Sequence, residues 1–289
     1  MSKPRREMSK IVPIALGQWP QAPLVFVLAQ VRFLPSNMAN LDVIKNALRG
    51  VLPTHFERVN ALMGLSMEVG SAPNDLAATA ASPIVVGYDF VNMNQEAVVR
   101  VMPDSLTYAV SHYKDYADFS AAWMNVVSVL PALGIMHIQR AGLRYVDFIY
   151  PAEGKVPEDY FLPPFDHRAS GRIKGAVSDA EINMLMQEYE FERGRLRVQY
   201  ARGRGQPGLP LDLQGLLPVA PSSLKTNHAG TSGTFDTDRW IDEEISSELK
   251  SLGESFSLLH NGISTAFKGS ISAFAKSEWA GQKDETNAA

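Results

Sequence analysis

Few residues in this sequence have types and spacings that could do chemistry. Asp236 and Asp238 occupy alternate positions of a predicted strand, where both side chains face the same way, as two ligands of a cation would need. No third ligand stands beside them, and the 6 histidines show no metal-ligand spacing. The chain has 0 cysteines, which excludes disulfides, thiolate metal sites and cysteine nucleophiles. The sequence therefore predicts no metal site and no cofactor.

Two short motifs match catalytic patterns in their letters only. Residues 203–208 read GRGQPG, the pattern of a dinucleotide-binding loop, but Pro207 and Pro210 prevent the helix that must follow such a loop. Residues 247–250 read SELK, the serine–lysine pattern of penicillin-binding enzymes, without its companion motifs. No nucleophile elbow is present either. The sequence thus predicts no catalytic residues and favours a protein that is not an enzyme.

Arginines are concentrated in one predicted β-hairpin between residues 185 and 200. If Arg193-Gly194 forms its turn, Glu190 lies opposite Arg197 on the paired strand, and such opposite charges favour a cross-strand ladder. Arg202 and Arg204 lie beyond the acidic residues. Together with Arg197 they are the candidate residues for binding a nucleic acid, a partner that the net charge of −4 does not favour.

A second group of polar residues falls on the predicted strand 137–149. Its candidate binding residues are Arg140, Arg144, Tyr145 and Asp147. Buried charges must be paired, so we expect Arg144 to pair with Asp147 or with a nearby acid. The alternative is that all four residues orient a ligand in a cavity between the sheet and a C-terminal helix.

The order of predicted elements defines the fold class. Strands are expected near residues 24–33, 84–92, 96–102, 105–112, 137–149 and 233–240, and a β-hairpin is expected at 185–200. Asn40 should open one helix, and Asp118 should cap another. A long C-terminal helix carries an apolar stripe from Leu249 to Phe274 and should break near Gly269. Strands that follow one another directly predict an α+β protein with a largely antiparallel sheet and packed helices.

Composition places the chain among ordinary globular proteins. It has 289 residues, of which 45% are hydrophobic and 20% are charged. We expect a loosely ordered lead-in at 1–20, a single α+β domain at 21–280 with a possible internal seam at 151–180, a long loop at 203–232, and a polar tail at 281–289. The N-terminal residues make a poor secretory signal, and no apolar run is long enough to span a membrane. Both features predict a cytoplasmic protein.

One stretch of the chain resembles a known family. Residues 139–149 (QRAGLRYVDFI) are similar to the Arg-x-Gly-Leu-Arg-Tyr-x-Asn-x-Ile segment of a sporadically distributed family of uncharacterised bacterial proteins, with Asp147 in place of the asparagine. Further landmarks that agree are 23–33, 116–123, 235–238, 259–260 and 266–267. The resemblance implies a cytoplasmic accessory protein associated with bacterial defence or mobile-element gene cassettes, without an established activity.

These observations leave three functional hypotheses. The leading one is a non-catalytic interaction or accessory protein, because Met184 and Met186 are expected to be exposed and methionines suit adaptable contacts. Its partner would be another protein or a second copy of the chain. The alternative is a small-molecule-binding or enzymatic domain with a cavity between the sheet and the C-terminal helix. The second alternative is the nucleic-acid binder described above.

Overall fold

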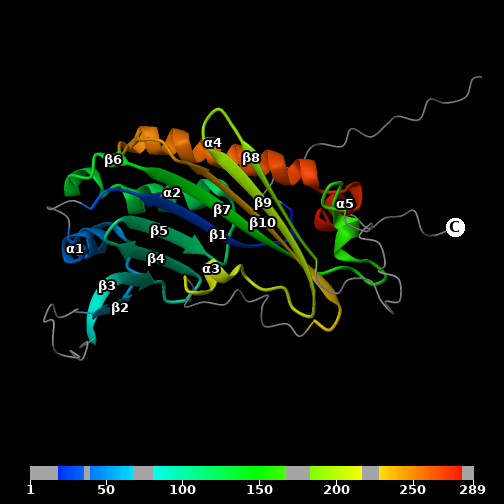
Figure 1. Cartoon of the computed structure of the whole chain (residues 1–289), viewed down its shortest axis with the longest axis horizontal. Coiled ribbons are helices and arrows are strands. Elements are labelled where there is room, and N and C mark those ends of the chain that lie inside the picture. Colours follow the sequence, from blue (N-terminus) through cyan, green and yellow to red (C-terminus); the bar gives the residue numbers. More distant parts are fainter. Residues whose placement is uncertain (1–18, 36–39, 68–80, 167–182, 217–227, 282–289) are drawn as a thin grey trace, which may run out of the picture.

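The computed structural model describes residues 19–35, 40–67, 81–166, 183–216 and 228–281. Most of the expected N-terminal lead-in and C-terminal tail therefore lies outside the described residues. The described part confirms the predicted α+β class, because an antiparallel nine-stranded sheet is packed against helices (Figure 1). Among the described residues, no helix is long and apolar enough to cross a membrane.

The large sheet contains nearly all the strands in the order β2-β3-β4-β5-β1-β7-β10-β9-β8. These strands are β1 (Leu24–Arg32), β2 (Arg58–Met67), β3 (Ala81–Val91), β4 (Ala97–Met102), β5 (Ser105–Val110), β7 (Arg140–Ile149), β8 (Asn183–Glu190), β9 (Arg195–Arg204) and β10 (Thr231–Ile241). Two short strands, β6 (His137–Ile138) and β11 (Ile245–Ser246), pair separately.

The two halves of this sheet repeat one arrangement. In the first half, β1 is followed by a meander whose last strand, β5, returns to pair beside β1. In the second half, β7 is followed by a meander whose last strand, β10, returns to pair beside β7. A helix follows each returning strand, and β1 and β7 pair antiparallel at the centre. Because the sheet runs continuously through both halves, it joins the residues before and after segment 151–180.

The helices begin and end where local signals favour it. They are α1 (Leu41–Val51), α2 (Tyr116–Val127), α3 (Leu211–Gln214), α4 (Leu249–Ser270) and α5 (Ala273–Trp279), with short 3₁₀ turns η1 (Pro131–Leu133) and η2 (Pro157–Tyr160). The Asn40 side chain caps α1 by accepting from the Val43 N–H at 3.0 Å, as expected. The predicted C-terminal helix is α4, and it ends at Ser270, close to the expected break at Gly269.

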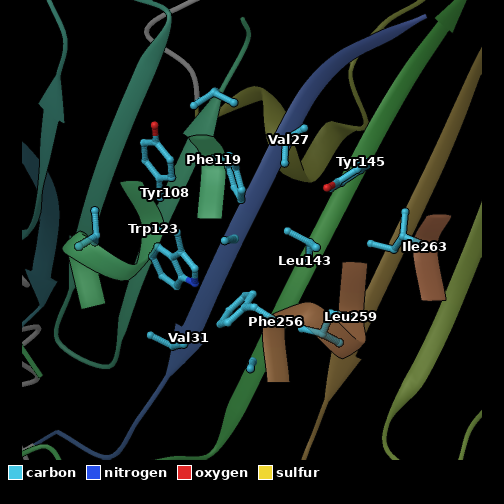
Figure 2. Close-up of a cluster of buried hydrophobic side chains, with 14 of the residues drawn as sticks. Val27, Val31, Tyr108, Phe119, Trp123, Leu143, Tyr145, Phe256, Leu259 and Ile263 are labelled. Atoms are coloured by element: carbon cyan, nitrogen blue, oxygen red, sulfur yellow. The ribbon is translucent and has the colours of Figure 1, made fainter. Parts of the chain in front are cut away.

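The main hydrophobic core lies between one face of the sheet and helices α1, α2 and α4. In α4 the predicted apolar stripe is buried, because Phe256, Leu259 and Ile263 lie at helical spacing and point towards the sheet (Figure 2). Trp123 of α2 meets Phe256 edge-on, with ring centres 5.3 Å apart. This packing fixes α4 across β7 and β10, the strands that carry the candidate site.

The opposite face of the sheet carries a smaller apolar cluster under α3. Phe26, Val146 and Phe148 of the sheet pack there with Leu209 and Leu213. The prediction of one long loop at 203–232 is wrong in part. Strand β9 continues to Arg204, α3 forms within the predicted loop, and β10 starts at Thr231. Residues 217–227 of that prediction lie outside the described residues.

Three further local predictions need correction. Strand β2 was not expected from the sequence, because as the edge strand it is exposed or half-buried and shows no buried stripe. Helix α2 is capped by Asp115, whose side chain accepts from the Asp118 N–H at 2.8 Å, so Asp118 belongs to the first turn. The hairpin turn spans residues 191–194, which places Glu190 opposite Arg195 and Glu188 opposite Arg197.

Candidate functional site

Strand β7 sends its four predicted site residues to two different faces of the sheet. Side chains alternate along a strand, so Arg140 and Arg144 share one face while Tyr145 and Asp147 share the other. The first face carries α3, and the second faces α4. The sequence-based hypothesis that all four residues orient one ligand is therefore wrong, because the sheet itself separates them.

Arg144 is held by acids on its own face. Its Nε and Nη2 donate to the Oδ1 and Oδ2 atoms of Asp236 at 2.8 and 2.7 Å. Its Nη1 and Nη2 donate to the carboxylate of Asp212 in α3. The expected pairing with a nearby acid is thus confirmed, but the acid is not Asp147. Arg140 lies over the Trp240 ring, with its guanidinium carbon 4.8 Å from the ring centre.

On the other face, Tyr145 and Asp147 line a cavity of about 230 Å³ between the sheet and α4. It lies beside the start of β1, near an irregularity in the β1–β7 register between Leu24 and Phe26. The other lining residues that matter for chemistry or shape are Trp19, Pro23, Leu24, Tyr113, Lys114, Thr237, His260, Ile263 and Phe267. The cavity thus has aromatic and aliphatic walls with a few polar groups.

Asp147 is the most unusual of these polar groups. The residue is only 4% exposed, and no donor among the described residues hydrogen-bonds to its carboxyl. Burial raises the pKa of this carboxyl well above its ordinary value, and the charge of Asp236 on the opposite face raises it further. The buried Asp147 carboxyl therefore favours its neutral, protonated form. A cation bound in the cavity would favour the ionised form.

Thr237 lies on β10 opposite Tyr145 and is fully buried. Its hydroxyl group has no hydrogen-bond partner among the described residues. A buried hydroxyl without a partner is costly, so it too is available to a ligand. Sequence reasoning missed Thr237, although its position two residues after the buried Phe235 on a strand would have placed it on the helix-facing side.

A chain of hydroxyl and imidazole groups forms the rest of the polar wall. The Tyr145 hydroxyl lies 2.9 Å from His260 Nδ1 and 3.4 Å from the Tyr113 hydroxyl. The His260 ring stacks on Tyr116, with ring centres 3.8 Å apart. Burial lowers the pKa of His260 to about 4, while burial raises the pKa of Tyr113 to about 12 and that of Tyr145 further. All three groups are therefore neutral near pH 7.

This arrangement is better suited to binding than to proton transfer. A general base works best with a pKa near the working pH, and the pKa of His260 is well below pH 7. Lys114 stands at the rim, where its Nζ donates to Asp118 at 2.7 Å, so it is already paired. Among the described residues, no group of three histidine, aspartate or glutamate side chains is placed to hold a metal ion.

The hairpin arginines are engaged within the chain. Arg197 donates to Glu188 through Nη2 at 3.0 Å, and Arg202 donates through Nη1 to the buried Glu158 at 3.2 Å. A cross-strand ladder is therefore present, but its acid is Glu188 and not the predicted Glu190. Arg202, a candidate for binding a nucleic acid, is paired with Glu158 instead. Arg204 also interacts within the chain. These contacts give the nucleic-acid hypothesis no support.

No protein-family model matches the chain, and no curated protein is significantly similar to it. The resemblance of residues 139–149 to a family of bacterial proteins therefore stays a prediction.

Proposed function

We propose that this chain is a small-molecule-binding protein whose cavity between the sheet and α4 receives a small organic cation with an apolar body. The observation that carries this proposal is the buried carboxyl of Asp147 in the cavity wall, which has no hydrogen-bond partner among the residues that the structure describes. Buried carboxyl groups are costly unless they are paired. A bound ammonium group would supply the missing partner.

The remaining walls of the cavity support the same ligand class. Trp19, Tyr113, Tyr145 and Phe267 surround the site with aromatic rings, whose faces attract cations. The Thr237 hydroxyl offers one further acceptor for an ammonium N–H. The cavity volume of about 230 Å³ is below the range of drug-sized sites, so the proposed ligand is a compact amine.

The binding test compares phenethylamine with phenethyl alcohol, which has the same ring and chain but no charge. We expect the amine to bind more tightly, and the Asp147→Asn variant to weaken its binding by about 10- to 100-fold, because a charge-assisted hydrogen bond is lost. Calorimetric titration in buffers of different ionisation enthalpy should show release of up to about one proton per amine bound, as Asp147 ionises.

A matched control is Asp42→Asn, which removes an acid outside the cavity lining, on a side chain that is 66% exposed. This variant should bind the amine as the wild type does. Equal affinity of the wild type for the amine and the alcohol would refute the proposal. So would unchanged amine binding by a folded Asp147→Asn variant.

A second candidate function, a protein-interaction role, is favoured by strand β8. This strand lies at one end of the sheet order, and Met184 and Met186 on it are 64% and 60% exposed, as the sequence predicted. An edge strand with flexible apolar side chains can add a strand from another chain. Light scattering tests the self-association form of this role. The wild type should exceed the mass of one chain, and the double change of Met184 and Met186 to lysine should restore that mass.

A further inference from the structure

A second groove lies on the other side of α4. It has a volume of about 470 Å³ and runs between α4, the β8–β9 hairpin and residues 163–165. Its walls are mainly apolar and include Tyr189, Leu196, Val198 and Ala266. None of these residues lines the cavity that contains Asp147. The groove is therefore a separate site, and its chemistry has to be explained by its own polar groups.

One buried cation, Arg239 of β10, lines this groove. The residue is only 4% exposed. Its Nη1 donates to the backbone carbonyl oxygen of Leu258 at 2.6 Å, while its Nε has no hydrogen-bond partner among the described residues. No carboxylate among those residues forms an ion pair with it. Its guanidinium carbon lies 4.6 Å from the ring centre of Phe191, a contact that does not neutralise charge.

Helix α4 is shaped to admit this arginine. A Cβ atom at Gly262 would lie 1.6 Å from Arg239 Nη1 and 2.4 Å from its Cζ, so only glycine leaves room for the guanidinium group. Glycine inside a helix is unfavourable relative to alanine. The chain thus combines a weakened helix with a buried cation that has no counter-charge among the described residues. A bound anion would supply that counter-charge.

We propose that this groove binds a medium-chain acyl carboxylate, with the carboxylate on Arg239 and the alkyl chain along the apolar wall. A planar carboxylate matches two N–H groups on one edge of a guanidinium group, and in Arg239 the Nη1 edge is already occupied by Leu258. Because Nε is buried in this arrangement, binding includes a small movement of the Arg239 side chain. The Tyr189, Leu196 and Val198 side chains provide the apolar contact area for the chain.

The test uses dodecanoate and dodecanol, each below its aggregation limit, on the full-length protein. Dodecanoate should bind the wild type more tightly than dodecanol. Arg239→Met keeps much of the apolar length and removes the charge, so dodecanoate affinity should fall by about 10- to 100-fold while dodecanol affinity stays the same. Equal wild-type affinity for the two ligands, or unchanged dodecanoate binding by Arg239→Met, would overturn the proposal.

Two glycine substitutions in α4 provide a second test that keeps the arginine. Gly262→Ala should displace Arg239 and weaken dodecanoate binding, whereas Gly253→Ala, where the nearest atom to a new Cβ is Met124 Sδ at 3.9 Å, should leave it unchanged. Similar effects of the two alanines would contradict the proposal. If neither Arg239→Met nor Gly262→Ala folds, the wild-type preference for dodecanoate over dodecanol still decides the question. Asp147→Asn should not alter dodecanoate binding, so this proposal can fail or succeed independently of the amine site.

Discussion

Replacing Arg144 with methionine tests how much the buried Arg144–Asp236 ion pair contributes to the stability of the fold. Arg144 makes a two-pronged contact with Asp236, whose side chain is only 6% exposed, and a second contact with Asp212, whose side chain is 65% exposed. Removing one partner of a buried pair typically destabilises a protein by about 3–5 kcal/mol, because the remaining charge is left buried. Removing the exposed acid by Asp212→Asn should destabilise by only about 0–1 kcal/mol.

The pH dependence of this effect has a definite sign. Burial raises the pKa of Asp236, and the hydrogen bonds from Arg144 oppose that rise. Without Arg144, the folded-state pKa of Asp236 rises further above its unfolded value. The folded variant then binds more protons than the unfolded chain, so its stability falls as the pH rises. The loss caused by Arg144→Met should therefore be larger at pH 7 than at pH 4.

The assay is urea unfolding followed by circular dichroism for the wild type, Arg144→Met, Asp212→Asn and the double variant Arg144→Met with Asp236→Leu. The double variant should recover most of the lost free energy of unfolding, because Asp236, the buried acid that Arg144→Met leaves without its ion pair, is removed as well. The reasoning is refuted if Arg144→Met is neutral at pH 7. It is also refuted if Asp212→Asn costs as much as Arg144→Met, or if the double variant recovers nothing.

Three further changes have expected outcomes. Trp123→Ala should lower the free energy of unfolding by about 3–5 kcal/mol in the same assay, because it empties part of the main core. Asn40→Ala should cost about 1 kcal/mol through the lost cap of α1, whereas Asn40→Asp, which keeps a capping oxygen, should cost little. Burial raises the pKa of Asp238 to about 6, so its contribution makes stability fall between about pH 4 and pH 6; Asp238→Asn should raise stability by roughly 1–3 kcal/mol at pH 7 and hardly change it at pH 3.

Local sequence patterns predicted most elements of the fold. The apolar stripe of α4, the buried alternation of Leu196 and Val198 in the hairpin, and the Asn40 cap are all present. These signals succeed because they depend on side chains a few residues apart. The edge strand β2 was missed because its described side chains are exposed or half-buried. A strand without a buried face does not need an apolar stripe in its sequence.

The candidate site was predicted only in part. Tyr145 and Asp147 were identified, but they were grouped with Arg140 and Arg144. Arg140 and Arg144 lie an odd number of residues from Tyr145, so the alternation of side chains along a strand already places them on the other face. Thr237 of β10 and His260 of α4 also line the site, although both lie far from β7 along the chain. No local pattern marks a threonine hydroxyl or a histidine ring that meets Tyr145 across more than a hundred residues.

The sequence by itself determined the α+β class, the amphipathic character of the long C-terminal helix and the presence of unusual charges on the central strand. It determined them because hydrophobic periodicity and burial cost are properties of each segment. Only the tertiary structure decided which acid pairs with Arg144, and that Arg239 lies against Gly262. It also decided that, among the described residues, Asp147 has no hydrogen-bond donor and Arg239 has no ion pair. Those outcomes depend on which strands become neighbours and on where α4 crosses them, and long-range packing alone sets both.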